Sequence, residues 1–285
     1  MKITSLSVKG VSPWNEDALI INESAGVFGV VDGATSLVPY TGAGGETGGY
    51  LAAQLIAQTC DAMAQDAGRL SPLGLLEEGN RLLRGRMVEA GIRPQQKEEL
   101  WSACAVLIHV EEHGIAYAHA GDCMLAAYYE DGSIRIVTHD QLAPVDDRTK
   151  EVWAQGVASG LNTRDELWAY AKPQIIVGRA LANSPGGYAV LNGEPDFVEY
   201  AEYGRISRTG VVSLLLLSDG LYIPTRAGES DREGALAVAV RVKEMGLQPY
   251  IEWLIALEES DPDCTAFPRV KKSDDKSAIY IDFAE

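Results

Sequence analysis

Acidic residues stand repeatedly at the ends of apolar, strand-like segments of this sequence. The run GVFGVV ends in Asp32-Gly33, and the run SLLLLS ends in Asp219-Gly220. Buried carboxylates without partners are costly, so a cluster of them must be offset by cations. Lys and Arg are scarce beside these motifs, whereas Mg²⁺ and Mn²⁺ favour oxygen ligands. The pattern therefore predicts a divalent metal site built from carboxylates.

Further acidic residues adjoin apolar runs or tight turns and extend this set. They are Glu16, Asp17, Asp122, Asp274 and Asp275. Because glycine beside a carboxylate lets backbone approach closely, the carbonyl of Gly33 is another candidate ligand. A single Asp-Gly pair is commonly only a turn, and we interpret Asp131-Gly132 as a hairpin turn. The regular placement of the other carboxylates after apolar runs favours one shared site.

The bulk composition is that of a globular protein. The chain has 285 residues, of which 46% are hydrophobic and 23% are charged, so it can bury a sizeable core. A net charge of −17 argues against nucleic acid and membrane surfaces as partners, because both are anionic. The four cysteines lack metal-finger spacing, and the N-terminus lacks a signal-peptide pattern. Together these features predict a cytoplasmic protein.

Hydrophobic periodicity predicts the elements that must position the acidic residues. We expect strands at residues 2–10, 17–23, 26–31, 102–112, 114–121, 196–203, 210–218 and 277–283, with a hairpin over 123–138. We expect helices at residues 50–67, 73–91, 146–156, 231–245 and 248–259. In the second of these helices, Leu82 should lie on the apolar side. Residues 143–175 read as a polar excursion around their single helix.

The order of these elements predicts the fold class. Helices follow groups of strands in pairs and do not alternate with single strands. This favours an α+β fold in which two sheets pack on one another with helix pairs outside, rather than a doubly wound parallel sheet. Because no repeat or clear linker interrupts the chain, we expect one domain over residues 1–285.

Six stretches, taken in order, resemble the metal-dependent protein phosphatases of type 2C. None of them is specific alone, but their order and spacing match the family over nearly the whole chain. The stretches are NEDAL (15–19), FGVVDGA (28–34), GGETGGYLAA (44–53), ACAVLI with AYAHAGDCML (103–125), LLLLSDGLY (214–222) and DDKSAIYI (274–281).

The resemblance implies a four-layer αββα sandwich, with two mainly antiparallel sheets flanked by helix pairs. It also implies a centre of two Mg²⁺ or Mn²⁺ ions at one end of the sandwich. By position, Asp32 would bridge the ions and Gly33 would offer its carbonyl. Asp219 and Asp274 would be ligands of one ion, and Asp275 ranks below Asp274 because the family often has Asn there.

Three more acidic residues take roles by the same resemblance. Glu16 and Asp17 resemble the outer pair that holds metal-bound water, and Asp122 resembles the residue that with Asp219 can hold a weaker third metal. The mechanism implied is attack on phosphorus by a hydroxide that bridges two ions. The expected substrate is a phosphorylated protein in a signalling context, dephosphorylated at phosphoserine or phosphothreonine.

The sequence departs from the family pattern at the substrate-binding side. Where the family often has an arginine that grips the substrate phosphate, this chain has Ser12, and Lys9 is the nearby candidate to replace it. Where many members have a histidine after the bridging Asp-Gly pair, it has Ala34. The flap-like segment 143–209 matches weakly, so substrate choice is the least constrained property.

These departures keep two alternatives open. One is a phosphatase-like regulatory or binding module that retains the fold and metal but turns over poorly. The other is a hydrolase of small phosphorylated metabolites that uses the same centre.

Overall fold

The computed structural model describes residues 1–66, 70–226 and 234–283. Its strands form two antiparallel sheets of five strands each. The first sheet contains, in spatial order, β1 (Lys2–Val8), β10 (Lys276–Asp282), β9 (Val211–Leu217), β6 (Met124–Tyr129) and β7 (Ile134–Ile136). The second contains β2 (Asp17–Asn22), β3 (Val27–Ala34), β4 (Ser102–Val110), β5 (Gly114–Ala120) and β8 (Glu202–Ser207).

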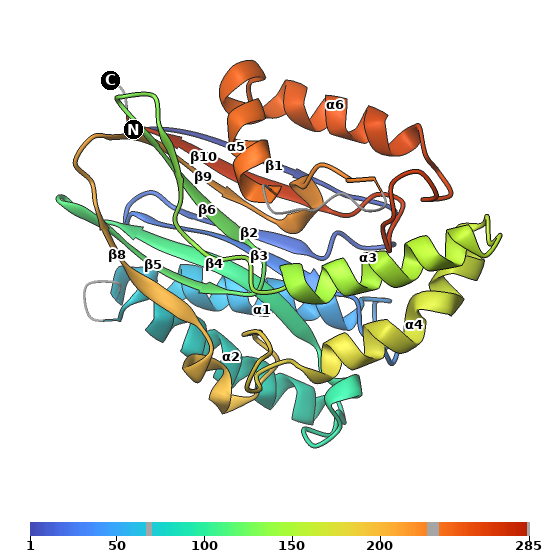
Figure 1. Cartoon of the computed structure of the whole chain (residues 1–285). Helices are drawn as coiled ribbons and strands as arrows, with labels where there is room; N and C mark the ends of the chain where they lie inside the picture. Colours follow the sequence, from blue (N-terminus) through green and yellow to red (C-terminus); the bar gives the residue numbers. More distant parts are fainter. Residues whose placement is uncertain (67–69, 227–233, 284–285) are drawn as a thin grey trace.

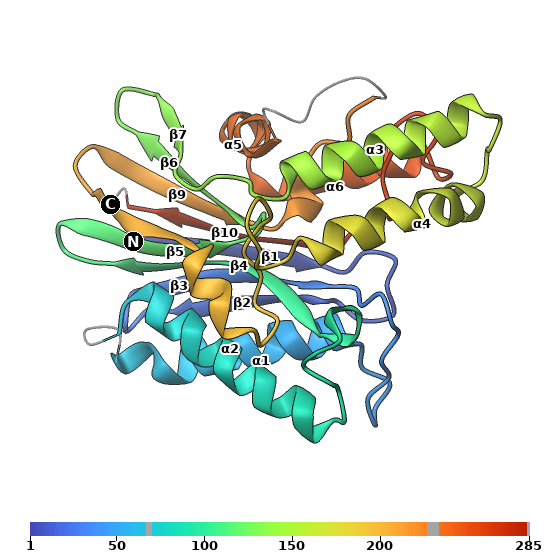
Figure 2. The same cartoon turned by 60° about the horizontal axis from the view of Figure 1, so that its bottom comes forward.

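Two helix pairs cover the outer faces of the sheets, as Figures 1 and 2 show. Helices α1 (Gly48–Met63) and α2 (Pro72–Glu89) pack on the second sheet. Helices α5 (Gly234–Met245) and α6 (Leu247–Glu259) pack on the first. The predicted α+β sandwich of four layers is therefore confirmed.

The apolar strand β9 illustrates why this fold needs uninterrupted hydrophobic runs. Leu214 and Leu216 face the core between the sheets, together with Phe28 of β3. Leu215 and Leu217 face the opposite way, toward α5 and α6. A strand covered on both faces has no solvent side, so it reads as a continuous apolar segment rather than an alternating one. Its end is thereby fixed between two packed layers.

A third helix pair, α3 (Ala143–Ala158) and α4 (Arg164–Ala180), lies at the end of the sandwich away from the chain termini (Figures 1 and 2). A capping box between Thr163 and Glu166 begins α4, which satisfies backbone donors at its first turn. Trp153 and Leu167 form a small separate core between the two helices. The predicted helix at 146–156 is confirmed, but the segment holds two long helices where the sequence predicted one.

Other sequence expectations are wrong in detail. The strand expected at 196–203 is a 3₁₀ helix, η3 (Pro195–Glu199), followed by β8; Pro195 has no N–H to give to a strand ladder. Leu82 is exposed on α2. Residues 231–233 of the helix expected at 231–245 lie outside the described residues. Short 3₁₀ turns also occur at η1 (Ala64–Asp66), η2 (Lys97–Glu99) and η4 (Asp219–Leu221). Among the described residues, no helix is long and apolar enough to cross a membrane.

Candidate active site

The two sheets bring the predicted carboxylates together at the end opposite the termini. Pairing of β2 with β3 sets Asp17 directly opposite Asp32. Asp219 follows β9, Asp274 precedes the neighbouring strand β10, and Asp122 precedes β6 on the other side of β9. Antiparallel neighbours place the end of one strand beside the start of the next. The charges of all four other carboxylates therefore raise the pKa of Asp32.

The carboxylates of Asp32 and Asp219 lie close enough to influence each other's pKa. Burial, followed by the charge of Asp17 and then of Asp219, raises the pKa of Asp32 well above its usual range. The cluster therefore disfavours full ionisation of its carboxylates.

Asp17 and Asp122 each leave a carboxylate oxygen without any partner. Both residues are buried, and Oδ1 of each makes no hydrogen bond. Asp17 does accept a hydrogen bond of 2.9 Å from Ser218 through its other oxygen. Burial, with a contribution from Asp274, raises the pKa of Asp17 to about 8. Orphaned buried oxygens of this kind are unusual in proteins and call for an ion or water.

Glu16 is fully buried but well satisfied. Its Oε1 accepts a hydrogen bond of 2.5 Å from the hydroxyl of Thr47, and its Oε2 accepts one of 2.7 Å from Thr35. Its backbone carbonyl accepts from the N–H of Gly33 at 3.0 Å. Glu16 therefore links β2 to the loop after β3 and to the N-terminus of α1.

Asp274 and Asp275 are adjacent in sequence but differ in what they contact. Asp275 accepts hydrogen bonds of 2.7 Å from the backbone N–H groups of Gly10 and Glu16, so its oxygens tie the chain before β2 to the start of β10. Asp274 instead accepts a 2.6 Å hydrogen bond from the ammonium of Lys271. The interpretation that cations are scarce beside these motifs is therefore wrong at Lys271.

These observations test whether the donor set fits a hard divalent ion. Within the three described segments, no three acidic, histidine or cysteine side chains already surround one point as a closed ion site. Asp274 contacts Lys271 instead, and Asp17 contacts Ser218. Their oxygen chemistry, the two orphaned oxygens and the raised pKa values all fit Mg²⁺ or Mn²⁺. The residues thus suit such an ion, which would offset their negative charges.

Gly33 allows the end of β3 to meet the first turn of α1. A Cβ atom on Gly33 would lie 2.2 Å from the carbonyl oxygen of Gly49. We expect Gly33→Ala to lower the free energy of unfolding by about 1–3 kcal/mol or more, because backbone cannot give way. Gly85→Ala, on the exposed side of α2 with nothing near its Cβ, should instead stabilise by about 0.5–1 kcal/mol. Urea unfolding compares the two; equal effects would contradict the proposed crowding.

Two further acidic residues belong to the surroundings of the site and were not predicted. Asp146 on α3 is half-buried, and burial raises its pKa to about 7, with Asp219 and Asp140 contributing and Lys150 opposing. Asp140 accepts a 3.2 Å hydrogen bond from the hydroxyl of Tyr222. Asp146 lies inside a helix rather than at a strand end, so the strand-end pattern could not indicate it.

A hollow of about 180 Å³ opens beside the cluster. Asp219 and Asp274 form part of its wall, and Asp146 of α3 lies across from them. Its lining also includes hydroxyls, cationic groups and apolar side chains, among them Thr149, Lys150, Tyr222, Thr225, Arg269, Val270 and Lys271. A substrate that enters it would reach the carboxylates directly.

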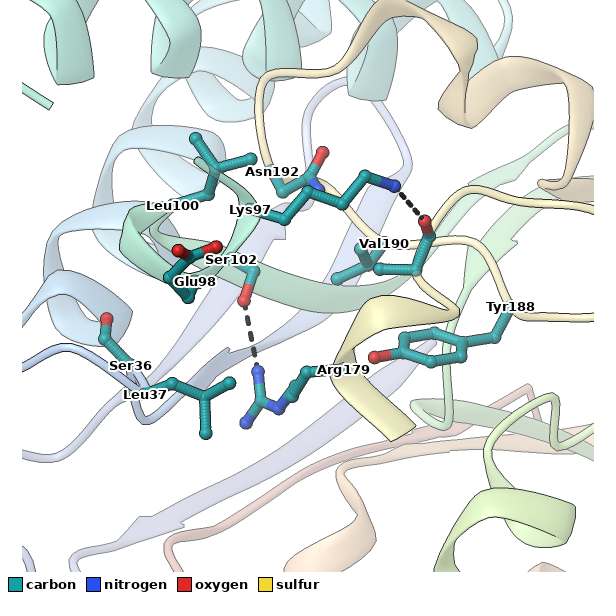
Figure 3. Close-up of a pocket in the computed structure, with 11 residues that line it drawn as sticks. Ser36, Leu37, Lys97, Glu98, Leu100, Ser102, Arg179, Tyr188, Val190 and Asn192 are labelled. Atoms are coloured by element: carbon teal, nitrogen blue, oxygen red, sulfur yellow. Dashed lines mark hydrogen bonds between the residues drawn. The ribbon is translucent and has the colours of Figure 1, made fainter. Parts of the chain in front are cut away.

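Figure 3 shows a second, smaller pocket at the C-terminal end of α4. The guanidinium of Arg179 donates to Ser102 Oγ at 3.4 Å and to the carbonyl of Thr35 at 3.2 Å. Lys97 donates to the carbonyl of Ala182 at 2.7 Å. Because Ser102 is the cross-strand partner of Ala34, Arg179 fixes α4 to the loop that follows the candidate bridging residue.

The predicted phosphate-binding candidate, Lys9, is exposed and lies outside the cluster's contacts. Its ammonium donates to the carbonyl of Ser12 at 3.1 Å. Ser12 is half-buried. Ala34 is the last residue of β3 and has only a methyl side chain. Neither residue supplies a cation or a proton donor to the site.

His119 lies next to the last residue of β5, fully buried, with neither ring nitrogen hydrogen-bonded. Burial, assisted by the charge of His139, lowers its pKa to about 3. Since the unfolded chain binds a proton near pH 6.5, stability should fall as pH drops from 6.5 toward 3. We expect a loss of about 3 kcal/mol between pH 7 and pH 4. His119→Phe should remove this loss, whereas His113→Phe, at an exposed position, should not. Urea unfolding of both variants at pH 7 and pH 4 measures the loss of stability. If both variants lose the same stability between these pH values, the assignment to His119 is contradicted.

Comparison with known proteins places these features in a family context. The sequence profile described as Protein phosphatase 2C matches residues 12–249. No curated protein is similar enough in sequence to match this chain.

Solved structures share the fold along the full chain. The Mycobacterium tuberculosis serine/threonine phosphatase PstP/Ppp is 20% identical, with a TM-score of 0.58 over 100% of this chain and 99% of its own. Stp1 from Staphylococcus aureus is 16% identical, with a TM-score of 0.57 over 100% of this chain and 95% of its own. The PstP catalytic domain in complex with two manganese ions is 18% identical, with a TM-score of 0.55 over 99% of this chain and 97% of its own.

Proposed function

We propose, from the premise that this chain belongs to the protein phosphatase 2C family, that it removes phosphate from phosphoserine and phosphothreonine of proteins in a metal-dependent reaction. The protein phosphatase class predicted from the sequence is confirmed by that membership. The observation that carries the finer proposal is the cluster of Asp17, Asp32, Asp122, Asp219 and Asp274, whose charges act on one another.

The residues that would hold the ions are those with oxygens directed into the cluster. Asp32 would be shared between two ions, beside the carbonyl of Gly33, while Asp219 and Asp274 would complete one ion's ligands. Asp122, with its orphaned Oδ1, would help to hold a third, weaker ion. When bound, Mg²⁺ or Mn²⁺ would supply the Lewis acidity that activates water and balances charge on the phosphoryl oxygens.

The chain's own residues would position water and the substrate for this reaction. Glu16, held by hydroxyls of Thr47 and Thr35, offers a fixed carboxylate for water, and Asp17 offers its unpaired oxygen. The hollow beside Asp219 admits the phosphorylated side chain. Because the chain carries no histidine at position 34, we infer that solvent protonates the leaving serine or threonine oxygen.

Steady-state hydrolysis of a phosphothreonine peptide tests this proposal. Turnover should require Mn²⁺ or Mg²⁺ and disappear with chelator. Metal-independent hydrolysis at the same rate would contradict it. Comparison with sugar phosphates separates a protein phosphatase from a hydrolase of small metabolites, which would prefer the sugars.

A second candidate follows from Ser12 and Ala34. A chain with the fold and the carboxylates but without the phosphate-gripping arginine could serve as a regulatory module. It would bind phosphorylated protein and metal with little turnover. Phosphopeptide binding with a turnover near the uncatalysed rate would favour this candidate over the enzyme, whereas ordinary phosphatase turnover would exclude it.

A further inference from the structure

The substrate's phosphate needs a cation that this chain does not supply at position 12. A phosphomonoester is a dianion near neutral pH, and the cluster beside the hollow is strongly acidic. Lys9 donates to a backbone carbonyl in an exposed position. Arg179 donates to Ser102 and Thr35. These two cations are therefore engaged away from the hollow, whereas Lys150, Arg269 and Lys271 line it. Of these three, Lys271 contacts a candidate metal ligand, Asp274.

Lys271 lies at that wall, against the candidate metal ligands. Its Nζ is 2.6 Å from Asp274 Oδ1 and 3.9 Å from Glu16 Oε2. Its side chain is only 20% exposed. The ammonium therefore lies inside the carboxylate cluster and not at the protein surface.

The loop that carries Lys271 is braced on both sides. Arg269 donates to the carbonyl of Lys272 at 3.0 Å and to Asp261 Oδ2 at 2.8 Å. The thiol of Cys264 lies 4.0 Å from the carbonyl oxygen of Lys271. A group held in this way loses little further freedom when it binds a ligand. The loop therefore holds the ammonium of Lys271 at the wall of the hollow before a ligand binds.

The lining of the hollow suits a phosphomonoester. Lys271 shares this space of about 180 Å³ with Asp219, Asp274 and the hydroxyls of Thr149 and Tyr222. A lysine ammonium has three N–H donors, and its hydrogen bond to Asp274 uses one of them. The others are available to phosphoryl oxygens that approach from the hollow.

We propose that Lys271 is the substrate's phosphate-binding residue and takes the place that arginine holds at position 12 in related phosphatases. This inference rests on the proposed phosphatase function. A lysine acts as a point charge rather than a planar fork. It therefore fixes the phosphate's location more than its orientation, and its removal should weaken binding more than it slows the chemical step.

The test compares Lys271→Met with Lys272→Met, which removes a charge from the next residue of the same loop. Calorimetry of the Mn²⁺-loaded proteins measures the affinity for inorganic phosphate, and steady-state kinetics with a phosphothreonine peptide measures kcat and KM. We expect Lys271→Met to weaken phosphate binding and raise KM by about tenfold to a hundredfold, with a smaller change in kcat. Lys272→Met should stay within about twofold, and Lys271→Arg should restore most of the affinity.

The opposing outcome has its own signature. If Lys271 only balances the carboxylates, Lys271→Met will bind Mn²⁺ more tightly and leave phosphate affinity and KM unchanged; this would overturn the inference. Should that variant fail to fold, the wild-type protein still decides. The ¹⁵Nζ resonance of Lys271 should shift when phosphate is added to the Mg²⁺-loaded protein, and a resonance that does not move would equally overturn it.

Failure of the inference and failure of the proposed function remain distinguishable. Wild-type turnover with unchanged phosphate affinity in Lys271→Met would leave the phosphatase intact and reject Lys271. Phosphate affinity that depends on Lys271, without turnover in the wild type, would support the binding residue and reject the enzyme.

Discussion

Asp32→Asn should abolish metal-dependent turnover, with a loss of about a thousandfold or more. Substitution of a residue that only supports a ligand costs roughly 10–100-fold in metal affinity or activity, and Asp32 is the candidate ligand shared by both ions. The amide keeps the shape of the side chain but removes its charge. Asp131→Asn, which changes an exposed hairpin turn, is the matched control and should retain wild-type turnover of a phosphothreonine peptide.

The same substitution should have the opposite effect on stability. Asp32 is surrounded by Asp17, Asp219, Asp274 and Asp122, and burial with their charges raises its pKa. In chelator at pH 8, loss of its charge should therefore raise the melting temperature above that of wild type. Addition of Mn²⁺ should stabilise wild type but not the variant. An Asp32→Asn protein that keeps both its turnover and its stabilisation by Mn²⁺ would contradict the assigned role.

Ionisation of Asp17 should lower the stability of metal-free wild-type protein as pH rises from about 4 to about 8, opposed below pH 6.5 by the contribution of His119. Asp17 has a folded pKa of about 8 against a usual value of 3.8, so in this window the folded protein binds more protons than the unfolded chain. Its contribution is fully present below the lower pKa and is lost as pH passes through the upper one. The loss amounts to about 5 kcal/mol at most, since one pKa unit corresponds to about 1.4 kcal/mol.

Bound metal should reverse this trend, because a divalent ion stabilises the ionised cluster and binds only the folded state. At about a thousand times the dissociation constant, this linkage is worth about 4 kcal/mol. Urea unfolding between pH 5 and pH 8, with chelator and with Mn²⁺, measures both slopes. Asp17→Asn should flatten the slope in chelator. If the slope in that variant equals that of wild type, general repulsion in this acidic chain explains the pH effect instead.

The sequence predicted the layers of the fold because they follow from strong periodic signals. Strands such as β9 are covered on both faces, and α1 and α2 carry a clear apolar side. The strand-end carboxylates were predictable for the same reason. Asp17 begins one apolar strand and Asp32 lies near the end of the next. Antiparallel pairing of the two strands places these residues directly opposite each other.

The remaining parts of the site depend on contacts between segments without periodicity. Lys271 lies in an irregular loop, and its proposed role rests on its contact with Asp274 and its place in the wall of the hollow. Asp146 approaches the cluster from α3, whose position is set by packing around Trp153 rather than by local sequence. The segment expected as a strand at 196–203 instead begins as the 3₁₀ turn η3, whose Phe197 is buried in the core beneath α1 and α2.

The central claim is that the carboxylate cluster holds two divalent ions, and anomalous diffraction from crystals grown with Mn²⁺ tests it most directly. The account predicts two strong anomalous peaks flanking Asp32, one of them also within reach of Asp219 and Asp274, and none there in Asp32→Asn crystals. Crystals of active wild-type protein with no anomalous peak at this cluster, or with Mn²⁺ bound only elsewhere, would contradict it.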